Sequence, residues 1–263
     1  MPKFAANLSM LFQELPFLDR FEAAARAGFR AVEFLFPYEY PAQDIRQRLD
    51  RLGLRQVLFN LPPGDWAKGE RGLAALPGRE AEFAAGVDRA IEYANALGCP
   101  QVHAMAGVAL DVPLEQAAAT YRANLRQAAD RLHAHGIRTL IEPLNSRDMP
   151  GYFLMTAEQA RQIIEAVNHP NLFLQMDLYH AQIMEGDLAT KLRRWLPHIG
   201  HIQIAGTPGR HEPDIGEVNY AWLLRHVDDL GYDGWVGCEY RPLTTTTAGL
   251  SWRNRLLAPG SET

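Results

Sequence analysis

The segment Leu172–Phe173–Leu174–Gln175–Met176–Asp177 is an apolar run that ends at a carboxylate. Three other short apolar runs in the second half of the chain also end at a residue that can bind a metal ion: Thr139–Leu140–Ile141–Glu142, His201–Ile202–Gln203 and Trp235–Val236–Gly237–Cys238–Glu239. Runs of this kind are typical of buried parallel strands. In a (β/α)8 barrel, the C-terminal ends of the strands form the rim that carries the chemistry. We therefore expect Glu142, Asp177, Gln203 and Glu239 to share one oxygen-rich site.

A repeated strand-then-helix pattern extends along almost the whole chain. Helical patterns end at Gly28, Gly53, Gly98, Gly136 and Gly231, and an apolar run follows each glycine. Glycine just past a helix can adopt the left-handed conformation that closes the last turn. Eight such units predict parallel strands with right-handed crossovers. The predicted strands lie near residues 3–7, 30–34, 55–59, 101–105, 138–142, 171–177, 200–205 and 234–239.

The fold class predicted from this pattern is an α/β protein, a (β/α)8 TIM barrel in which residues 1–263 form a single domain. The 263 residues suit this fold, because it typically needs about 250. The eighth unit is weak, since only a short tail after Thr247 supplies its helix. A doubly wound open sheet would give the same alternation, but no GxGxxG follows the first strand. The predicted helices lie near residues 16–27, 41–52, 79–97, 113–135, 156–168, 184–197 and 219–230.

Residues 60–78 form a connection that is too long for a plain turn between a strand and a helix. Loops longer than about 12–15 residues are usually functional or disordered. This loop carries Trp66, Lys68 and Arg71, which makes it a candidate lid that places cations over the site. The alternative interpretation is a surface excursion with a buried tryptophan.

The expected site has the chemistry that a hard divalent cation requires. Mg²⁺ and Mn²⁺ prefer carboxylate, amide-carbonyl and water oxygens, whereas zinc more often recruits histidine or cysteine. We therefore expect Mg²⁺ or Mn²⁺, bound by Glu142, Asp177, Gln203 and Glu239, with positions left open for a bidentate substrate. Salt bridges at the strand ends are the alternative. A cluster of three buried carboxylates favours a cation, because buried charges need partners.

Several polar residues near the rim are candidates for contacts with the substrate or with the site residues. His180 follows Asp177 after the sixth strand, and Arg210 lies after the seventh. Arg210 is expected to hold a substrate carboxylate through a two-pronged hydrogen bond, and its alternative is a surface pair with Glu212. Glu33 ends the second strand and either joins the site or orients a neighbouring loop.

Two carboxylates that face each other across a metal suit one reaction type in particular. The metal polarises a carbonyl and its neighbouring hydroxyl, which makes the proton between them easier to remove. One glutamate takes that proton and the other returns one to the adjacent carbon, through an enediolate. Glu142 and Glu239 are the natural pair, because the fifth and eighth strands lie roughly across the barrel from each other. The reaction is an aldose–ketose isomerisation.

The chain resembles the xylose isomerase-like barrels and, within them, the hydroxypyruvate isomerase family. The similarity extends nearly from end to end. Its most specific stretches are Phe4–Ala5–Ala6–Asn7–Leu8–Ser9–Met10–Leu11–Phe12, Val32–Glu33–Phe34–Leu35–Phe36–Pro37–Tyr38, residues 63–72, residues 76–80, Ile141–Glu142–Pro143–Leu144–Asn145 and residues 234–240.

This resemblance implies specific roles for the site residues. Glu142 and Glu239 would be the acid–base pair, and Asp177 and Gln203 would complete the metal site. Related sugar epimerases carry histidine where this chain has Gln203, so the set of ligands departs from theirs. The reaction of the family interconverts hydroxypyruvate and tartronate semialdehyde (2-hydroxy-3-oxopropanoate). A 2-oxo acid of this kind carries a carboxylate, for which Arg210, Lys68 and Arg71 are the candidate partners.

A sibling group, the 2-oxo-tetronate isomerases, is nearly as similar. Residues 105–108, 203–206 and 210–213 look like that group, whereas residues 66–71 and 141–145 look more like hydroxypyruvate isomerase. The weight of these motifs favours the three-carbon acid. The chemistry would be the same for either acid, and only the length of the pocket would differ.

Two other function classes use the same fold. A metal-dependent endonuclease of this fold usually has several histidine ligands and basic loops, whereas this chain has a net charge of −5 and a histidine-poor cluster. We therefore expect no nucleic-acid partner. A sugar-binding barrel without catalysis would explain a pocket but not two opposed glutamates.

The remaining expectations concern the surroundings of the protein. No apolar stretch approaches the roughly 20 residues of a membrane span, and no secretion signal precedes the first strand, so we expect a cytoplasmic protein without a membrane partner. Cys99 and Cys238 lie in or beside predicted strands without CxxC spacing, as expected of reduced core residues. Trp222 and Trp252 are expected to be exposed aromatics that permit a homo-oligomer interface.

Overall fold

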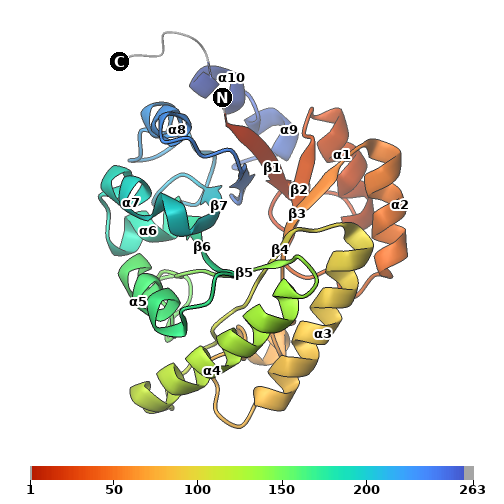
Figure 1. Ribbon diagram of the computed structural model, residues 1–263. Coiled ribbons are helices and arrows are strands. Elements are labelled where there is room, and N and C mark those ends of the chain that lie inside the picture. The colour runs from red at the N-terminus through yellow and green to blue at the C-terminus, as the bar shows by residue number, and fades with distance from the viewer. Residues whose placement is uncertain (1, 258–263) are drawn as a thin grey trace.

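The computed structural model describes residues 2–257 as a barrel of eight parallel strands surrounded by helices (Figure 1). Each strand pairs with the next one in sequence, and β1 pairs with β8, which closes the barrel. The closed order confirms the predicted (β/α)8 barrel and rules out an open sheet. The strands are β1 (Lys3–Asn7), β2 (Ala31–Glu33), β3 (Arg55–Asn60), β4 (Gln101–His103), β5 (Arg138–Ile141), β6 (Leu172–Asp177), β7 (Ile199–Ile204) and β8 (Trp235–Cys238).

The helices lie on the outside of the barrel (Figure 1). Two of the predicted glycine caps illustrate why they end where they do, since Gly53 and Gly98 have φ values of 62° and 66° after α2 and α3. Within residues 2–257, no helix has the length and hydropathy needed to span a membrane. The helices are α1 (Arg20–Arg26), α2 (Ala42–Leu52), α3 (Glu80–Leu97), α4 (Leu114–His133), α5 (Ala157–Val167), α6 (Leu178–Met184), α7 (Leu188–Trp195), α8 (Tyr220–Asp229), α9 (Thr246–Gly249) and α10 (Trp252–Leu257).

Helix α6 begins directly after β6 and was not expected from the sequence. Asp177 ends β6 and also caps α6, because its side chain accepts a hydrogen bond from the backbone N–H of Tyr179. A capping carboxylate of this kind satisfies one of the unpaired donors in the first helical turn. His180 therefore lies in the first turn of this helix.

The C-terminal unit closes the barrel with short helices instead of one long helix. The indole of Trp252 packs edge-on against Phe4 of β1, with ring centroids 5.1 Å apart. Its Nε1 donates to the hydroxyl of Tyr240 over 3.0 Å. Trp252 is fully buried, so the expectation that it is exposed is wrong, whereas Trp222 is 48% exposed. The apolar surface of this indole completes the core where the helices that follow β8, α9 and α10, are short.

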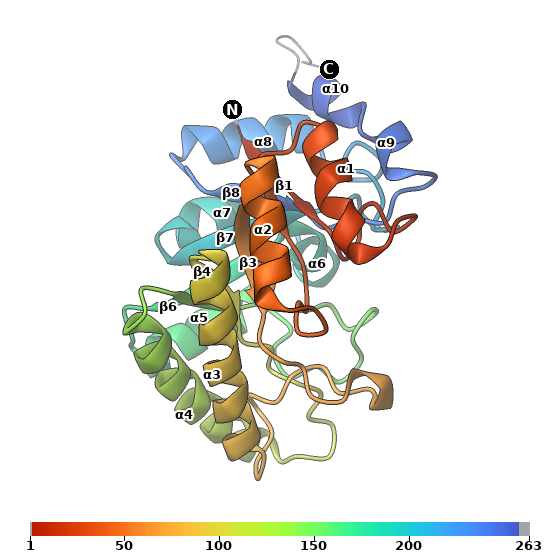
Figure 2. The ribbon, with the colours of Figure 1, turned by 90° about the vertical axis from the view of Figure 1, so that its right-hand side faces the viewer.

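The connection from β3 to α3, residues 61–79, is anchored to the barrel and extends from it (Figure 2). Gly72 forms an isolated bridge with Ala106, and the Glu70 carboxylate accepts from Arg79 over 2.7 Å. The Trp66 ring contacts the ring of Phe36, with centroids 5.2 Å apart. Trp66 is 37% exposed, so this loop is not a simple excursion around a buried tryptophan.

One carboxylate lies inside the barrel below the rim. Glu33 of β2 is fully buried, and its two oxygens accept hydrogen bonds from Asn7 (3.0 Å), His201 Nε2 (2.7 Å) and Gln203 Nε2 (2.7 Å). Donors from β1 and β7 thus converge on β2 across the interior. Gly237 of β8 leaves the room for this carboxylate, because a Cβ at that position would overlap both of its oxygens. The buried His201 side chain thus has a role in the core.

We expect Gly237→Ala to destabilise the protein, by about 1–3 kcal/mol as for other overpacked cores. The added methyl displaces Glu33 and breaks hydrogen bonds that hold a buried charge. Urea unfolding monitored by circular dichroism measures the change. Gly86→Ala in α3 is the matched control, because its Cβ would make ordinary contact with Pro62; equal stability of the two variants would contradict this account.

Candidate active site

The residues predicted at the strand ends converge at the rim of the barrel. Glu142 directly follows β5, Asp177 ends β6, Gln203 lies in β7 and Glu239 directly follows β8, and all four are buried. Register places Asp177 level with Gln203 on the neighbouring strand. Side chains from β5, β6, β7 and β8 therefore meet although they are separated by up to about a hundred residues in sequence.

A cavity of about 170 Å³ opens beside these residues. This volume is small compared with the roughly 300–1,000 Å³ of pockets for drug-sized ligands, so it suits a small metabolite. Its walls combine apolar side chains with acids and two arginines. They are Met10, Leu35, Asn60, Trp66, Met105, Glu142, Leu144, Asp148, Met149, His180, Arg210, Glu239 and Arg241.

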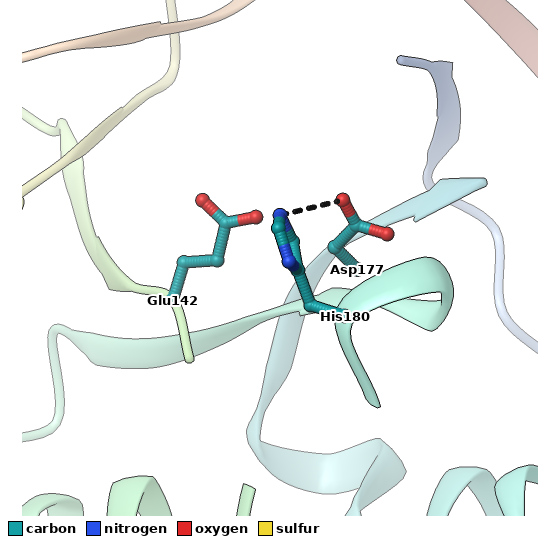
Figure 3. A group of neighbouring side chains, drawn as sticks. All are labelled: Glu142, Asp177 and His180. Carbon is teal, nitrogen blue, oxygen red and sulfur yellow. Dashed lines mark ion pairs between the residues drawn. The ribbon is translucent and has the colours of Figure 1, made fainter. Parts of the chain in front are cut away.

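Glu142, Asp177 and His180 form a compact polar group in the site (Figure 3). One ligand-type atom from each lies within 4.8 Å of the other two. His180 Nε2 is 3.6 Å from Asp177 Oδ2. On the other side of Glu142, its Oε2 lies 3.4 Å from Nδ1 of the buried His103. The free ends of the two carboxylates and of the imidazole point into one common space (Figure 3).

The hydrogen bonds of His180 define which of its nitrogens carries the proton. Nδ1 accepts from the backbone N–H of Asn145 (3.1 Å) and from its side-chain amide (2.7 Å). Burial, followed by the nearby positive charge of Arg210, lowers the pKa of His180 well below its usual value, so the ring is neutral. A neutral ring that accepts at Nδ1 carries its proton at Nε2. His180 therefore faces the acids with Nε2–H as a hydrogen-bond donor.

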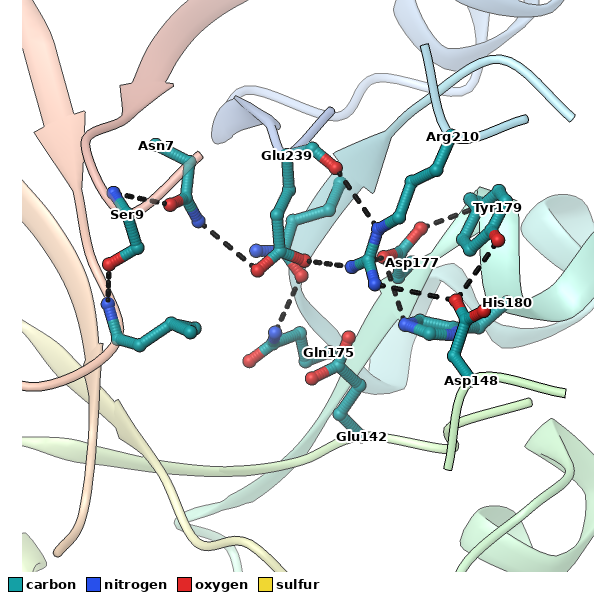
Figure 4. Close-up of polar contacts among 12 residues, drawn as sticks. Asn7, Ser9, Glu142, Asp148, Gln175, Asp177, Tyr179, His180, Arg210 and Glu239 are labelled. Carbon is teal, nitrogen blue, oxygen red and sulfur yellow. Dashed lines mark hydrogen bonds and ion pairs between the residues drawn. The ribbon is translucent and has the colours of Figure 1, made fainter. Parts of the chain in front are cut away.

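Glu239 is held from two sides (Figure 4). Its Oε1 accepts from Asn7 over 3.2 Å, and its Oε2 accepts from Arg210 over 3.0 Å. The same guanidinium lies 3.7 Å from Asp177 and 3.6 Å from Asp148. Arg210 is thus buried among three carboxylates, and the alternative of a surface pair with Glu212 is not what the structure shows.

Tyr179 completes the surroundings of Arg210 (Figure 4). The Arg210 guanidinium lies over the Tyr179 ring, 5.0 Å from its centroid. The Tyr179 hydroxyl donates to Asp148 over 3.0 Å. A guanidinium that is stacked on a ring and paired with acids has a defined orientation. The position of Glu239 therefore depends on Arg210, whose own position depends on Tyr179 and Asp148.

Gln203 is fixed by the buried network below the rim. Its Nε2 donates to Glu33 over 2.7 Å, and its Oε1 accepts from Gln175 over 2.6 Å. An amide oxygen has two lone pairs, so the bond from Gln175 leaves one acceptor position. Because Gln203 Nε2 donates to Glu33, Glu33 orients the amide of a site residue. The alternative, that Glu33 orients a neighbouring loop, is not what these contacts show.

The two predicted cations of the lid lie away from the cavity. Lys68 is strongly exposed and pairs with Asp65 over 2.9 Å. The Arg71 guanidinium lies over the Trp66 ring, 3.8 Å from its centroid, and donates to the backbone oxygens of Trp66 and Glu70. Both side chains make their contacts within the loop of residues 61–79, and Trp66 of this loop lines the cavity.

Burial and mutual repulsion raise the pKa values of the site carboxyls. Burial raises the pKa of Glu142 well above its ordinary value, and the Glu239 and Asp177 carboxylates raise it further. Burial also raises the pKa of Glu239 to about 8, although Arg210 opposes that shift. The Asp177 pKa is raised by burial too, against the lowering effects of Arg210 and backbone N–H donors. The folded protein therefore holds protons here that water-exposed carboxyls would have lost.

A hard divalent cation fits the donor set. Glu142 Oε1 and Asp177 Oδ2 are buried, and neither receives a hydrogen bond from any residue within 2–257. Buried carboxylate oxygens without partners are costly. A cation between them would provide the missing partner and would lower the raised pKa values by favouring the ionised carboxylates.

Sequence reasoning did not single out several residues of the site. They are Asn7 and His103, which contact Glu239 and Glu142, Asn145, which donates to His180, and Asp148 and Arg241, which line the cavity. Asn7 and His103 end β1 and β4, and their position at the ends of predicted strands is a signal that was available in the sequence. The other three lie in loops, whose course the sequence pattern does not give.

Buried acids at the C-terminal rim, around a small cavity, define this molecule as a (β/α)8-barrel enzyme. The sequence model of the xylose isomerase-like TIM barrel family matches residues 21–256. The chain belongs to this xylose isomerase-like TIM barrel family.

Named relatives support an isomerase. The chain is 58% identical to the 2-oxo-tetronate isomerase of Cupriavidus necator over 253 residues, covering 96% of this chain and 97% of that protein. It is 49% identical to the hydroxypyruvate isomerase of Escherichia coli (strain K12), with 96% and 98% covered. These similarities identify the protein as an isomerase.

Solved structures agree with the fold. A protein from Brucella melitensis, described as an AP endonuclease of family 2, superposes with a TM-score of 0.95 at 52% identity, covering 96% of this chain and 98% of that one. An L-ribulose 3-epimerase superposes with a TM-score of 0.76 at 21% identity, covering 100% and 89%. The second likeness concerns the fold alone.

The raised pKa values predict how stability depends on pH in protein treated with chelator. In the unfolded chain a glutamate carboxyl has a pKa near 4.3, whereas in the folded protein the pKa of Glu239 is about 8. The folded state thus binds more protons between these values, so the stability contributed by protonated Glu239 is full below the unfolded pKa and is lost as pH rises to about 8. We expect the melting temperature to fall between pH 5.5 and 8.5, as measured by calorimetry.

The variant Glu239→Gln should show a smaller fall, because one of the titrating groups is gone. Adding Mn²⁺ at about a hundred times its Kd should raise the wild-type melting temperature by about 5–10 °C. If the melting temperature of the metal-free wild type fell no more between pH 5.5 and 8.5 than that of the variant, the raised pKa of Glu239 would be contradicted.

Proposed function

We propose that the protein is a metal-assisted isomerase that moves a proton between adjacent carbons of a small 2-oxo acid. One observation carries this proposal: two buried glutamates, Glu142 and Glu239, line the same small cavity and both have raised pKa values. A carboxyl whose pKa lies near the working pH can both accept and return a proton. The neighbouring acid Asp177 and the donor His180 complete the group.

The substrate that we propose first is a 2-oxo-tetronate, with hydroxypyruvate second. The relative with 58% identity carries the former name, and the relative from Escherichia coli with 49% identity carries the latter. The motifs of the sequence favoured the three-carbon acid, and these identities shift the weight to the four-carbon acid. In either molecule the proton moves from C3 to C2, and the hydroxyl proton on the C3 oxygen moves to the C2 oxygen.

The side chains of this chain provide both proton transfers. One glutamate removes the C3 proton, and the other delivers a proton to C2 of the enediolate. Glu142 has an oxygen without a hydrogen bond, which leaves it free to approach the substrate, whereas Arg210 and Asn7 orient Glu239. His180 Nε2–H donates to the substrate oxygen on which charge develops.

Mg²⁺ or Mn²⁺ is the cation that we propose for this site, with Glu142, Asp177, Gln203 and Glu239 as its ligands. When bound, it would polarise the carbonyl and the adjacent hydroxyl of the substrate. The positive charge of Arg210 reduces the electrostatic repulsion between Glu239 and Asp177. Trp66 lines the cavity, and in this role as part of a lid it would limit the access of water and protect an enediolate from side reactions.

We expect Glu142→Gln and Glu239→Gln each to lower kcat by about 10²–10⁴-fold, because each removes a positioned proton-transfer group. Turnover on both acids, together with deuterium uptake from heavy water into C2, measures the loss. Glu217→Gln is the matched control, since Glu217 is exposed on the rim and does not line the cavity. If either glutamine variant turned over nearly as fast as the control, the glutamate that it replaces would not belong to the acid–base pair.

Kinetics on the two acids, measured side by side, test the choice of substrate. We expect kcat/KM to be higher for 2-oxo-tetronate than for hydroxypyruvate, and both values to fall when a chelator removes the metal. The reverse order would assign the three-carbon acid to the site. Activity on both acids that a chelator leaves unchanged would contradict the role of the metal.

Nuclease activity is the remaining alternative, because the structure from Brucella melitensis carries an endonuclease description. The walls of the cavity carry more acids than arginines. Like charges on the site and on the backbone oppose such binding. A lack of retention on heparin at moderate salt would support the isomerase.

A further inference from the structure

The proposed substrate carries a negative charge into a cavity that is rich in acids. Glu142, Glu239 and Asp148 line the cavity, and Asp177 lies beside them. Repulsion between like charges at short range costs several kcal/mol where water is excluded. A 2-oxo acid therefore needs a cationic partner for its carboxylate. This inference rests on the proposed function and concerns the identity of that partner.

The cation predicted for this task, Arg210, is already occupied. It donates to the side chain of Glu239 over 3.0 Å and to its backbone oxygen over 3.4 Å. It also lies within 3.7 Å of Asp177 and Asp148 and covers the ring of Tyr179. A substrate carboxylate that bound Arg210 would have to displace a buried acid from its salt bridge. That exchange leaves the acid unpaired, which is the costly outcome.

Arg241 is the other arginine on the cavity wall. Its backbone is fixed at both ends: the N–H donates to the oxygen of Arg210 over 2.7 Å, and the carbonyl accepts from His211 over 2.8 Å. Its side chain is exposed, and within residues 2–257 it has no hydrogen bond or ion pair. An anchored backbone with a free guanidinium at the mouth of a cavity is suited to bind an incoming carboxylate.

We propose that Arg241 binds the carboxylate of the substrate and thereby sets the specificity for 2-oxo acids over neutral sugars. Arg241 follows Glu239 by two residues, in the segment after β8, so the carboxylate would be held on the Glu239 side of the cavity. Its neighbours C2 and C3 then extend towards Glu142 and His180, which line the same cavity. Glu239 remains paired with Arg210 throughout.

The variants Arg241→Gln and Arg241→Lys test this proposal. We expect Arg241→Gln to raise KM for 2-oxo-tetronate and for hydroxypyruvate by at least about 10-fold, with kcat within about 3-fold of wild type, because uniform binding is lost. Arg241→Lys should recover part of the affinity, since an ammonium keeps the charge but not the two-pronged geometry. Arg147→Gln is the matched control: Arg147 is exposed in the loop between β5 and α5 and does not line the cavity.

Two outcomes overturn the proposal. A KM of Arg241→Gln equal to that of Arg147→Gln would show that Arg241 does not bind the substrate, and a loss in kcat with KM unchanged would show a disturbance of the catalytic groups instead. Calorimetric titration with tartronate, an unreactive hydroxy acid, separates this inference from the proposed function. Tartronate should bind to wild type and bind at least about 10-fold more weakly to Arg241→Gln, even if neither 2-oxo acid is turned over.

Discussion

Repulsion among buried carboxylates is the constraint on which the rest of the site depends. Glu142, Asp177 and Glu239 come together where little water reaches them, and the strand ends of a closed barrel leave them no way to separate. Arg210 compensates part of this charge from the loop after β7. Burial raises the pKa values of these carboxyls, and the repulsion that Arg210 leaves uncompensated raises the pKa of Glu142 further. Glu142 Oε1 and Asp177 Oδ2 are left without a hydrogen bond from the described residues. Either a bound cation or the protonation of a glutamate would compensate the remaining negative charge.

The layer below the rim explains why the acids keep their positions. Glu33 accepts hydrogen bonds from Asn7 and Gln203, and Asn7 also donates to Glu239. The interior carboxylate is thus linked to the rim by single amide side chains. Gly237 is required because any side chain there would occupy the place of Glu33. One buried acid therefore determines the residue type at several positions that are distant in sequence.

Most of the fold could be predicted from the sequence, because glycine caps and apolar runs are local signals. The strand near residues 171–177 was placed within one residue, and the four residues that end the runs do meet at one rim. Helix α6 was missed because Asp177 serves the strand and the helix at once, so no separate cap is visible in the sequence. Trp252 was misjudged because the burial of an indole near a chain end depends on Phe4, which lies far away in sequence.

The chemistry of the site was harder to predict than its location. A sequence shows that Arg210, Lys68 and Arg71 are cations, but it does not show which of them already have partners. Arg71 lies on Trp66 and Lys68 pairs with Asp65, so both cations have their partners within the loop of residues 61–79. The proton position of His180 likewise depends on a backbone N–H from another loop. Partners of this kind are fixed by tertiary structure and leave no local pattern.

The division of positive charge follows from the requirements of the chemistry. Proton transfer needs carboxylates with raised pKa values, and those require burial and repulsion. The same acids repel an anionic substrate, so one cationic group cannot serve both tasks without alternating between them. Arg210 is buried and paired, and can stabilise the acids but is not free for the substrate. Arg241 is exposed and anchored only through its backbone, so it can meet the substrate without disturbing the acids. Separating these tasks between two arginines lets the pocket remain acidic enough for catalysis while it still admits an anion.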